Sequence, residues 1–347
     1  QSRKKGPKMA QATNFTAKTG VKVFFGTEAT FGTATVAVTG TWDQLPVVSY
    51  TIPETIAALD IGPKRAGLNV DFGTAACHRK DQAGFPFDIT MYGTPTAVLK
   101  ACQLMFEDGV SAATLAGNYQ FPVETVYQYA QSSTSQMTVL FQGAGDDTTA
   151  NDIHCISCVA TGLQIKESLD SDAGKMMVTV NLITYFQPVH SNFGAPDTYA
   201  SVYTLDTGSP KNIFSLATFD IDNGTARDLV PYEWEINFSR TVERVSYIDT
   251  TNWKPFGYVM GEGGITVTGS MVVKSDDNTN ALLADYIDSG TVDINIAESS
   301  GFTIDIPTAM FNEPSKQLDD TFKNVYPFTA MGDWADLTSN VISITIA

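Results

Sequence analysis

Alternation of apolar and polar residues with a period of two dominates this chain. The alternating runs are rich in Thr, Val, Ile, Phe and Tyr, which strands prefer, and clusters of Gly and Asp or Asn separate them. The pattern predicts strands over residues 21–25, 136–142, 153–160, 175–186, 232–240, 265–273, 291–296, 302–306 and 341–346. We therefore expect a mainly β protein.

Two segments have a helical period instead. In the first, Thr94 can cap the helix, Pro95 takes its first position, and the apolar stripe is Val98, Ala101, Cys102 and Met105. In the second, Ser275 or Asp276 can cap, Gly290 can end the helix, and the stripe is Leu282, Leu283, Tyr286 and Ile287. Each helix is one-sided, so we expect each stripe to be buried against a sheet, with Lys100 on the solvent face.

The order of these elements occurs twice. The strand ending in Ile89–Gly93 leads into the first helix, the strand beginning Ile265–Gly269 leads towards the second, and similar strands follow each helix. The recurrence predicts two tandem β-sandwich or β-barrel domains of the tube type, each flanked by one short α-helix. We place an N-terminal extension at 1–19, the first domain at 20–186, a linker at 187–211 and the second domain at 212–347.

Composition narrows the class of protein. The 347 residues carry a formal net charge of −17, which argues against binding nucleic acid by neutralising phosphates. No apolar run approaches the roughly 20 residues that span a bilayer. Four cysteines are too few for a disulfide framework in a chain of this length.

The candidate chemistry along the chain is weak. Asp206-Thr-Gly and Asp288-Ser-Gly are similar to the paired signatures of aspartic proteases, but they lie too close in sequence for a whole lobe to separate them. Cys155 and Cys158 form a single C-x-x-C on a strand, where residues three apart point to opposite faces, so we expect these thiols to diverge. Cys77 and His78 could complete a zinc set only if the fold brought them there. We expect no enzyme activity and no cofactor or metal.

Several stretches resemble one family. The segment 25–34, FGTEATFGTA, precedes 42–46, WDQLP, and 50–54, YTIPE; in the second half 235–243 precedes a Gly-rich arm and 264–271, GITVTGSM. This order resembles tail tube proteins of long-tailed bacteriophages. The resemblance implies a β-sandwich with one helix, six such domains in a ring, and rings stacked into a tube through which double-stranded DNA passes without specific binding. Two domains per chain then imply homotrimeric rings with pseudo-sixfold symmetry, in the virion tail, with other tail proteins as neighbours. The alternative is a β-sandwich binding module, such as a capsid decoration or a surface adhesin.

Two long arms precede the two helix-forming corners, at 56–84 and 242–264. They are rich in Gly, Pro, Lys and Arg in an otherwise acidic chain, so we expect them to reach the acidic surface of an adjacent ring. The candidate inter-ring contacts are Lys64, Arg65, Arg79, Lys80, Arg244 and Lys254.

Overall fold

The computed structural model describes residues 21–28, 31–32, 42–53, 59–61, 77–79, 84–105, 117–122, 128–130, 136–142, 152–191, 203–222, 229–245, 257–260, 265–299, 301–318, 322–332 and 340–346. Most of these lie in strands, so the protein is mainly β, as the alternation predicted. The expected N-terminal extension at 1–19 falls outside the described residues.

The first half of the chain contains β1 (Lys22–Thr27), β2 (Trp42–Gln44), β3 (Val47–Tyr50), β4 (Leu59–Ile61), β5 (Cys77–Arg79), β6 (Phe85–Tyr92), α1 (Pro95–Met105), β7 (Gly117–Pro122), β8 (Gln128–Ala130), β9 (Met137–Gln142), β10 (Asp152–Ser168) and β11 (Met177–Thr184). In the sequence, β12 (Val189–Ser191) and β13 (Tyr203–Leu205) lie between the two halves. The second half contains β14 (Leu216–Asp222), β15 (Pro231–Ser239), β16 (Val242–Val245), β17 (Gly257–Met260), β18 (Thr266–Lys274), α3 (Asp277–Ser289), β19 (Val292–Glu298), β20 (Phe302–Phe311), β21 (Ser315–Leu318), β22 (Phe322–Ala330) and β23 (Asn340–Ile346).

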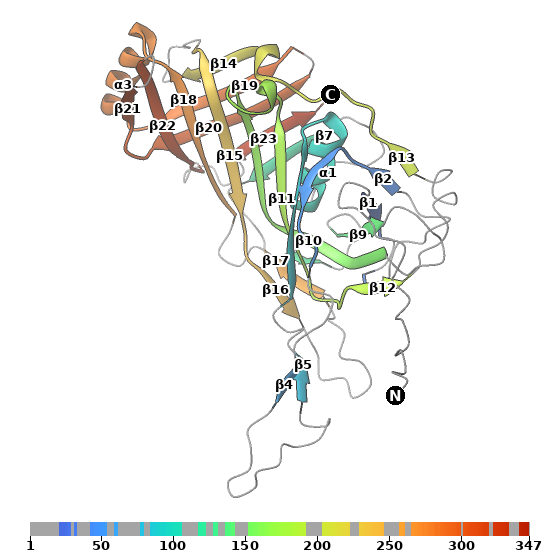
Figure 1. Ribbon diagram of the computed structural model, residues 1–347. Coiled ribbons are helices and arrows are strands. Elements are labelled where there is room, and N and C mark those ends of the chain that lie inside the picture. Colours follow the sequence, from blue (N-terminus) through green and yellow to red (C-terminus); the bar gives the residue numbers. More distant parts are fainter. Residues whose placement is uncertain are drawn as a thin grey trace, which may run out of the picture.

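One sheet runs through both halves without a break (Figure 1). Its strand order is β3-β6-β11-β10-β15-β18-β22-β21, and every neighbouring pair is antiparallel. A further layer of strands packs behind each half. It is β2-β1-β9-β10 in the first half and β14-β19-β20-β23-β7 in the second. The N-terminal part of β10 belongs to this layer, and its C-terminal part belongs to the shared sheet.

The same pairing order, down to its irregularities, occurs in both halves. The series β1-β9-β10-β11-β6-β3 corresponds to β14-β19-β20-β22-β18-β15. Opposite β6, strand β3 has one extra residue, Val48, and opposite β18, strand β15 has Tyr232 at the same place. Residues 156–157 bulge out opposite β9, and residues 307–308 bulge out opposite β19. Bulges are positional features of a fold, so two of them at matching places favour an internal duplication.

The sequence match that first suggested the duplication is out of register. Gly93 lies just before α1, but Gly269 lies in the middle of β18, five residues before that strand ends at Lys274. A side chain at Gly269 would collide with the Glu235 carbonyl and the Phe328 ring. Close packing between β15 and β22, and not a strand-to-helix corner, therefore accounts for this glycine.

Both helices begin at their predicted caps, and α3 also ends where its cap predicts. Thr94 Oγ1 accepts the Ala97 N–H, Asp276 forms a capping box with Thr279, and Gly290 ends α3 in the left-handed conformation. The α1 stripe is fully buried, and Leu282 of α3 is buried too. Ile287 is 74% exposed, so its place in the α3 stripe was predicted wrongly.

Lys100 contradicts the expected solvent face of α1. The side chain is buried, and Nζ lies 2.8 Å from Asp43 Oδ2 on β2. Helix α1 lies between the sheet and the strands behind it, so its polar side is covered as well as its apolar stripe. A helix period distinguishes apolar from polar faces, but it does not indicate that a second layer covers the polar one.

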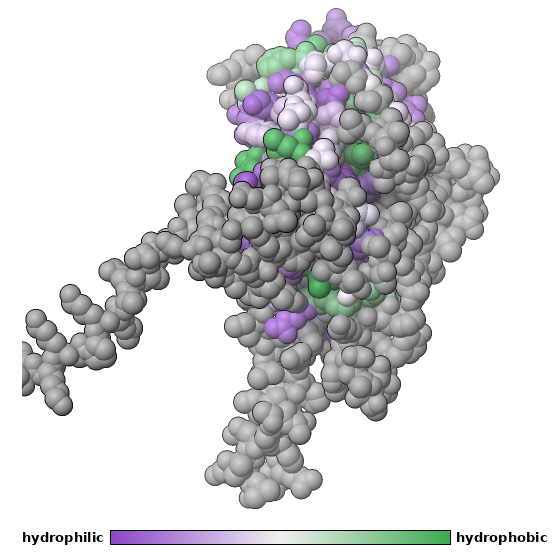
Figure 2. Space-filling view, turned by 90° about the vertical axis from the view of Figure 1, so that its right-hand side faces the viewer, coloured by the Kyte–Doolittle hydropathy of each residue, from purple (hydrophilic) through white to green (hydrophobic). Residues whose placement is uncertain are grey.

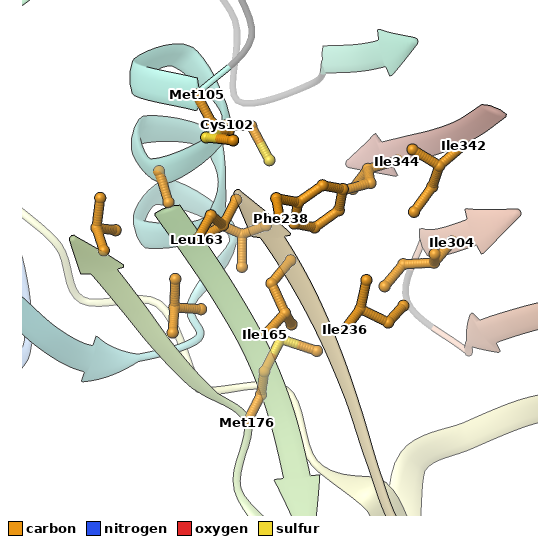
Figure 3. Packing of buried hydrophobic residues seen from close by; sticks show 14 of the residues in the cluster. Cys102, Met105, Leu163, Ile165, Met176, Ile236, Phe238, Ile304, Ile342 and Ile344 are labelled. Atoms are coloured by element: carbon orange, nitrogen blue, oxygen red, sulfur yellow. The ribbon is translucent and has the colours of Figure 1, made fainter. Parts of the chain in front are cut away.

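The hydrophobic core is continuous across the two halves. Figure 3 shows Cys102 and Met105 of α1 above Leu163 of β10, beside Phe238 of β15. The same cluster continues to the second layer of the second half, where it includes Ile304, Ile342 and Ile344.

Segments cross between the halves in both directions. From the first half, β7 pairs with β23, and β8 pairs with β17. Within the expected linker 187–211, β12 pairs with β10 and β13 runs parallel to β2, so its described parts lie on the first half. The domain boundaries drawn from the sequence stay a prediction.

Candidate assembly edges

The two halves join where β10 meets β15. Residues Gly162–Ser168 pair with Glu233–Ser239 in an uninterrupted antiparallel register. Ile165 faces Ile236 at the centre of this junction, and both side chains are buried. Backbone hydrogen bonds and apolar pairs therefore hold one half edge to edge with the other.

A buried polar group lies beside this junction. Trp234 Nε1 of β15 donates to Glu167 Oε2 of β10 over 2.9 Å, and Lys211 Nζ lies 3.7 Å from Glu298 Oε2. Burial and, after it, the charge of neighbouring Glu298 raise the pKa of Glu167 to about 9, although the Trp234 hydrogen bond lowers it. The buried setting therefore favours the neutral form of Glu167.

Each partner of this junction has a counterpart in the other half. Gln164–Glu167 of β10 lie opposite β11 as Ser315–Leu318 of β21 lie opposite β22. Tyr50 of β3 pairs with Ile89 on β6 as Trp234 of β15 pairs with Met271 on β18. Strand β21 is thus the counterpart of the joining part of β10, and β3 is the counterpart of β15.

These two counterparts are the outer strands of the shared sheet. Among the described residues β3 pairs with β6 alone, and β21 pairs with β22 alone. Both edges present apolar side chains to solvent: Ile52, just after β3, is 48% exposed, and Leu318 at the end of β21 is 72% exposed. An unpaired strand edge readily adds another strand, so soluble proteins usually protect such edges.

The face of the shared sheet that turns away from the core is polar. Its residues pair with each other: Thr90 with Thr179, Asn181 with Asp88, Gln164 with Glu235, and Lys166 with Glu233 in an ion pair. The other face of these strands carries the buried core. The positive charge of Lys166 on this face is thereby matched by a carboxylate.

Hydrophobic and hydrophilic residues are mixed on another side of the molecule. On the face shown in Figure 2, green and purple residues are interspersed over the coloured part. The coloured part of this face shows no single large apolar patch.

The arms contain hairpins at matching places. Strands β4 and β5 pair between β3 and β6, and β16 and β17 pair between β15 and β18. Of the candidate inter-ring residues, Arg79 ends β5 and Arg244 lies in β16, while Lys64, Arg65, Lys80 and Lys254 lie outside the described residues. Their contact with an adjacent ring stays a prediction.

The FGTEATFGTA segment has a structural role that sequence reasoning missed. Glu28 is buried and accepts hydrogen bonds from the Ser157 N–H (2.6 Å), Ser157 Oγ (2.7 Å) and Thr138 Oγ1 (2.7 Å). Ser157 lies in the β10 bulge with a φ of 50°, and its Oγ also accepts the Gly32 N–H. Burial raises the pKa of Glu28 despite these donors. The glutamate therefore satisfies polar groups that the bulge frees from strand pairing.

The remaining candidate residues have structural settings. Asp206 accepts the Gly208 N–H in a turn and the Thr94 hydroxyl beside α1, whereas Asp288 lies in α3 in the other half. The prediction that Cys155 and Cys158 diverge was wrong: the bulge between them turns both towards one face, where Cys158 Sγ donates to the Cys155 carbonyl. Within the described part of the chain, no group of three metal-ligating side chains occurs.

Comparison with known proteins adds no relative. No protein-family model and no curated protein sequence matches this chain. Among the described helices, none has the length and apolar character that a membrane crossing requires.

Proposed function

We propose that this protein forms the tail tube of a long-tailed bacteriophage, with three chains in each ring and no catalytic role. The observation that carries the proposal is the junction between β10 and β15, together with the exposed counterparts of both strands at the two outer edges. A molecule whose edges match its own internal junction can repeat that junction with further copies. Such a head-to-tail contact closes into a ring when the rotation per step fits.

The internal junction also gives the register between chains. Ile165 faces Ile236 within the chain. Their counterparts are Lys316 of β21 and Ile52, so these two residues face each other where one chain meets the next. Each chain contributes two equivalent units, and three chains give six positions around the ring.

The polar sheet face supports a role as the wall of a DNA channel. Thr90 bonds to Thr179 there, Asn181 and Gln164 donate to carboxylates of neighbouring strands, and Lys166 is matched by Glu233. Free cations would bind phosphates and slow a moving duplex, and a net charge of −17 per chain opposes such binding.

Cysteine cross-linking tests the register. In a Cys77→Ser background, Ile52→Cys and Lys316→Cys together should form a disulfide between chains, giving dimers and trimers on a non-reducing gel. The other cysteines within the described residues, Cys102, Cys155 and Cys158, are buried. The control pair combines Ile52→Cys with Leu205→Cys, an exposed residue on β13. Equal cross-linking of both pairs, or none of the first, would contradict this edge contact.

A further inference from the structure

The second hairpin is anchored on the first half of its own chain. Tyr258 of β17 is completely buried, with its ring centroid 5.3 Å from that of Tyr185 and 5.1 Å from that of Phe31. Its hydroxyl accepts the Tyr185 N–H, and the Tyr185 hydroxyl donates to the Val242 carbonyl over 2.8 Å. The hairpin β16–β17 thus crosses the internal junction and covers the neighbouring unit.

This hairpin covers a small apolar surface on the first half. Val159 of β10 and Tyr185, just after β11, are both buried in the cluster that contains Tyr258. Val159 pairs with Ile183, and its counterpart Met310 on β20 pairs with Thr329.

The matching surface of the second half lies open. Counted along β11 and β22, Met331 takes the place of Tyr185. Met310 is 39% exposed and Met331 is 40% exposed. The second half therefore carries, uncovered, the surface that a hairpin covers on the first half.

The first hairpin has the matching position in the chain. It leaves the first half between β3 and β6, as β16–β17 leaves the second half between β15 and β18. In Figure 1, β4 and β5 lie at the lower end of the molecule, beyond the two sheets. In a ring, the unit next to the β3 edge is the second half of another copy.

We infer that the β4–β5 hairpin of one chain docks on the Met310–Met331 surface of a second copy, across the contact between β3 and β21. The inference rests on the proposed ring, because that contact brings hairpin and surface together. Methionine side chains are flexible and polarisable, which suits them to receive a partner's hairpin. The arm would then join chains within a ring, besides any contact that it makes with the next one.

Photo-cross-linking tests this contact in assembled protein. Met331 is replaced by benzoylphenylalanine, and the labelled chain is mixed with ¹⁵N-labelled chain so that contacts between copies are identified by mass. We expect the main product to link residue 331 of one copy to a peptide within 54–84 of another. The same photo-reactive residue at Leu205 should give no link to 54–84.

A substitution gives an independent readout. Met310→Asp with Met331→Asp should leave the thermal midpoint of the isolated chain within about 2 °C, because both side chains are partly exposed. It should raise the concentration needed for assembly at least tenfold, whereas Leu205→Asp should not change it. Links from residue 331 only to other segments, or unchanged assembly, would overturn the docking even if the Ile52→Cys, Lys316→Cys variant still formed its disulfide. Failure of the Ile52→Cys, Lys316→Cys variant to form its disulfide, with Met310 and Met331 unchanged, would overturn the ring, and the docking with it.

Discussion

Trp234 donates its indole N–H to Glu167 across the strands that join the two halves of the chain, over 2.9 Å. Both side chains are fully buried, so this bond lies inside the continuous core and not at a solvated domain boundary. Their counterparts at the outer edges are Tyr50 and Leu318. The internal junction therefore has a buried polar bond, whereas the contact proposed between chains replaces the carboxyl group by a leucine.

The Glu167 carboxyl group should make folding stability pH-dependent. Its pKa is raised to about 9 in the folded chain, against 4.5 for an ordinary glutamate. The contribution of this carboxyl group to the free energy of unfolding is therefore fully present below about pH 4.5. It falls as the pH rises towards 9, because the unfolded chain loses this proton first. Glu167→Gln keeps an acceptor for Trp234 and should flatten the decline. Urea unfolding of the wild type and of Glu167→Gln between pH 5 and 9 measures this decline. If the unfolding free energies of the two proteins changed in parallel with pH, a neutral Glu167 would be contradicted.

Lys100→Ala should destabilise the first half strongly. The change leaves the Asp43 carboxylate buried without its 2.8 Å partner, which typically costs about 3–5 kcal/mol. The double variant Lys100→Met with Asp43→Asn removes both charges and should recover most of the loss. Chemical denaturation decides between these outcomes. A loss below about 0.5 kcal/mol for Lys100→Ala would mean that the pair is solvated.

The two ends of the α3 stripe should respond differently to truncation. Leu282→Ala removes a buried side chain and should cost about 2–5 kcal/mol. Ile287→Ala removes a side chain that is 74% exposed and should change stability by no more than about 0.5 kcal/mol. Thermal melts of the unassembled chain compare them. Equal losses would show that α3 packs differently.

Glu28→Ala should destabilise the fold through the β10 bulge. It removes the acceptor of the Ser157 N–H, and an unsatisfied buried donor costs about 1–3 kcal/mol. Thr138→Val, which removes only the third donor to Glu28, is the matched control and should cost less. Equal unfolding free energies for the wild type and Glu28→Ala would exclude this role.

Periodicity predicted both helices and many of the longer strands, because burial on one face fixes a repeat of two or 3.6 residues. It missed others, β14 and β22 among them. It could not predict that a second layer buries Lys100, nor that a bulge turns Cys155 and Cys158 towards one face. Both depend on contacts far apart in the sequence. The edge residues Ile52 and Leu318 were missed because an exposed apolar residue indicates an assembly contact only when its strand lies at the edge of a sheet. The sequence does not show which strands are outer ones. The crossing of β7 to β23 had no local signal at all.

The central claim is that each chain supplies two of six positions in a ring. Native mass spectrometry of rings released from the assembled protein counts the chains directly. We predict a mass equal to three chains, and for the Ile52→Cys, Lys316→Cys variant a disulfide at every contact between chains. A ring of six chains would contradict the claim, because each chain would then fill only one position.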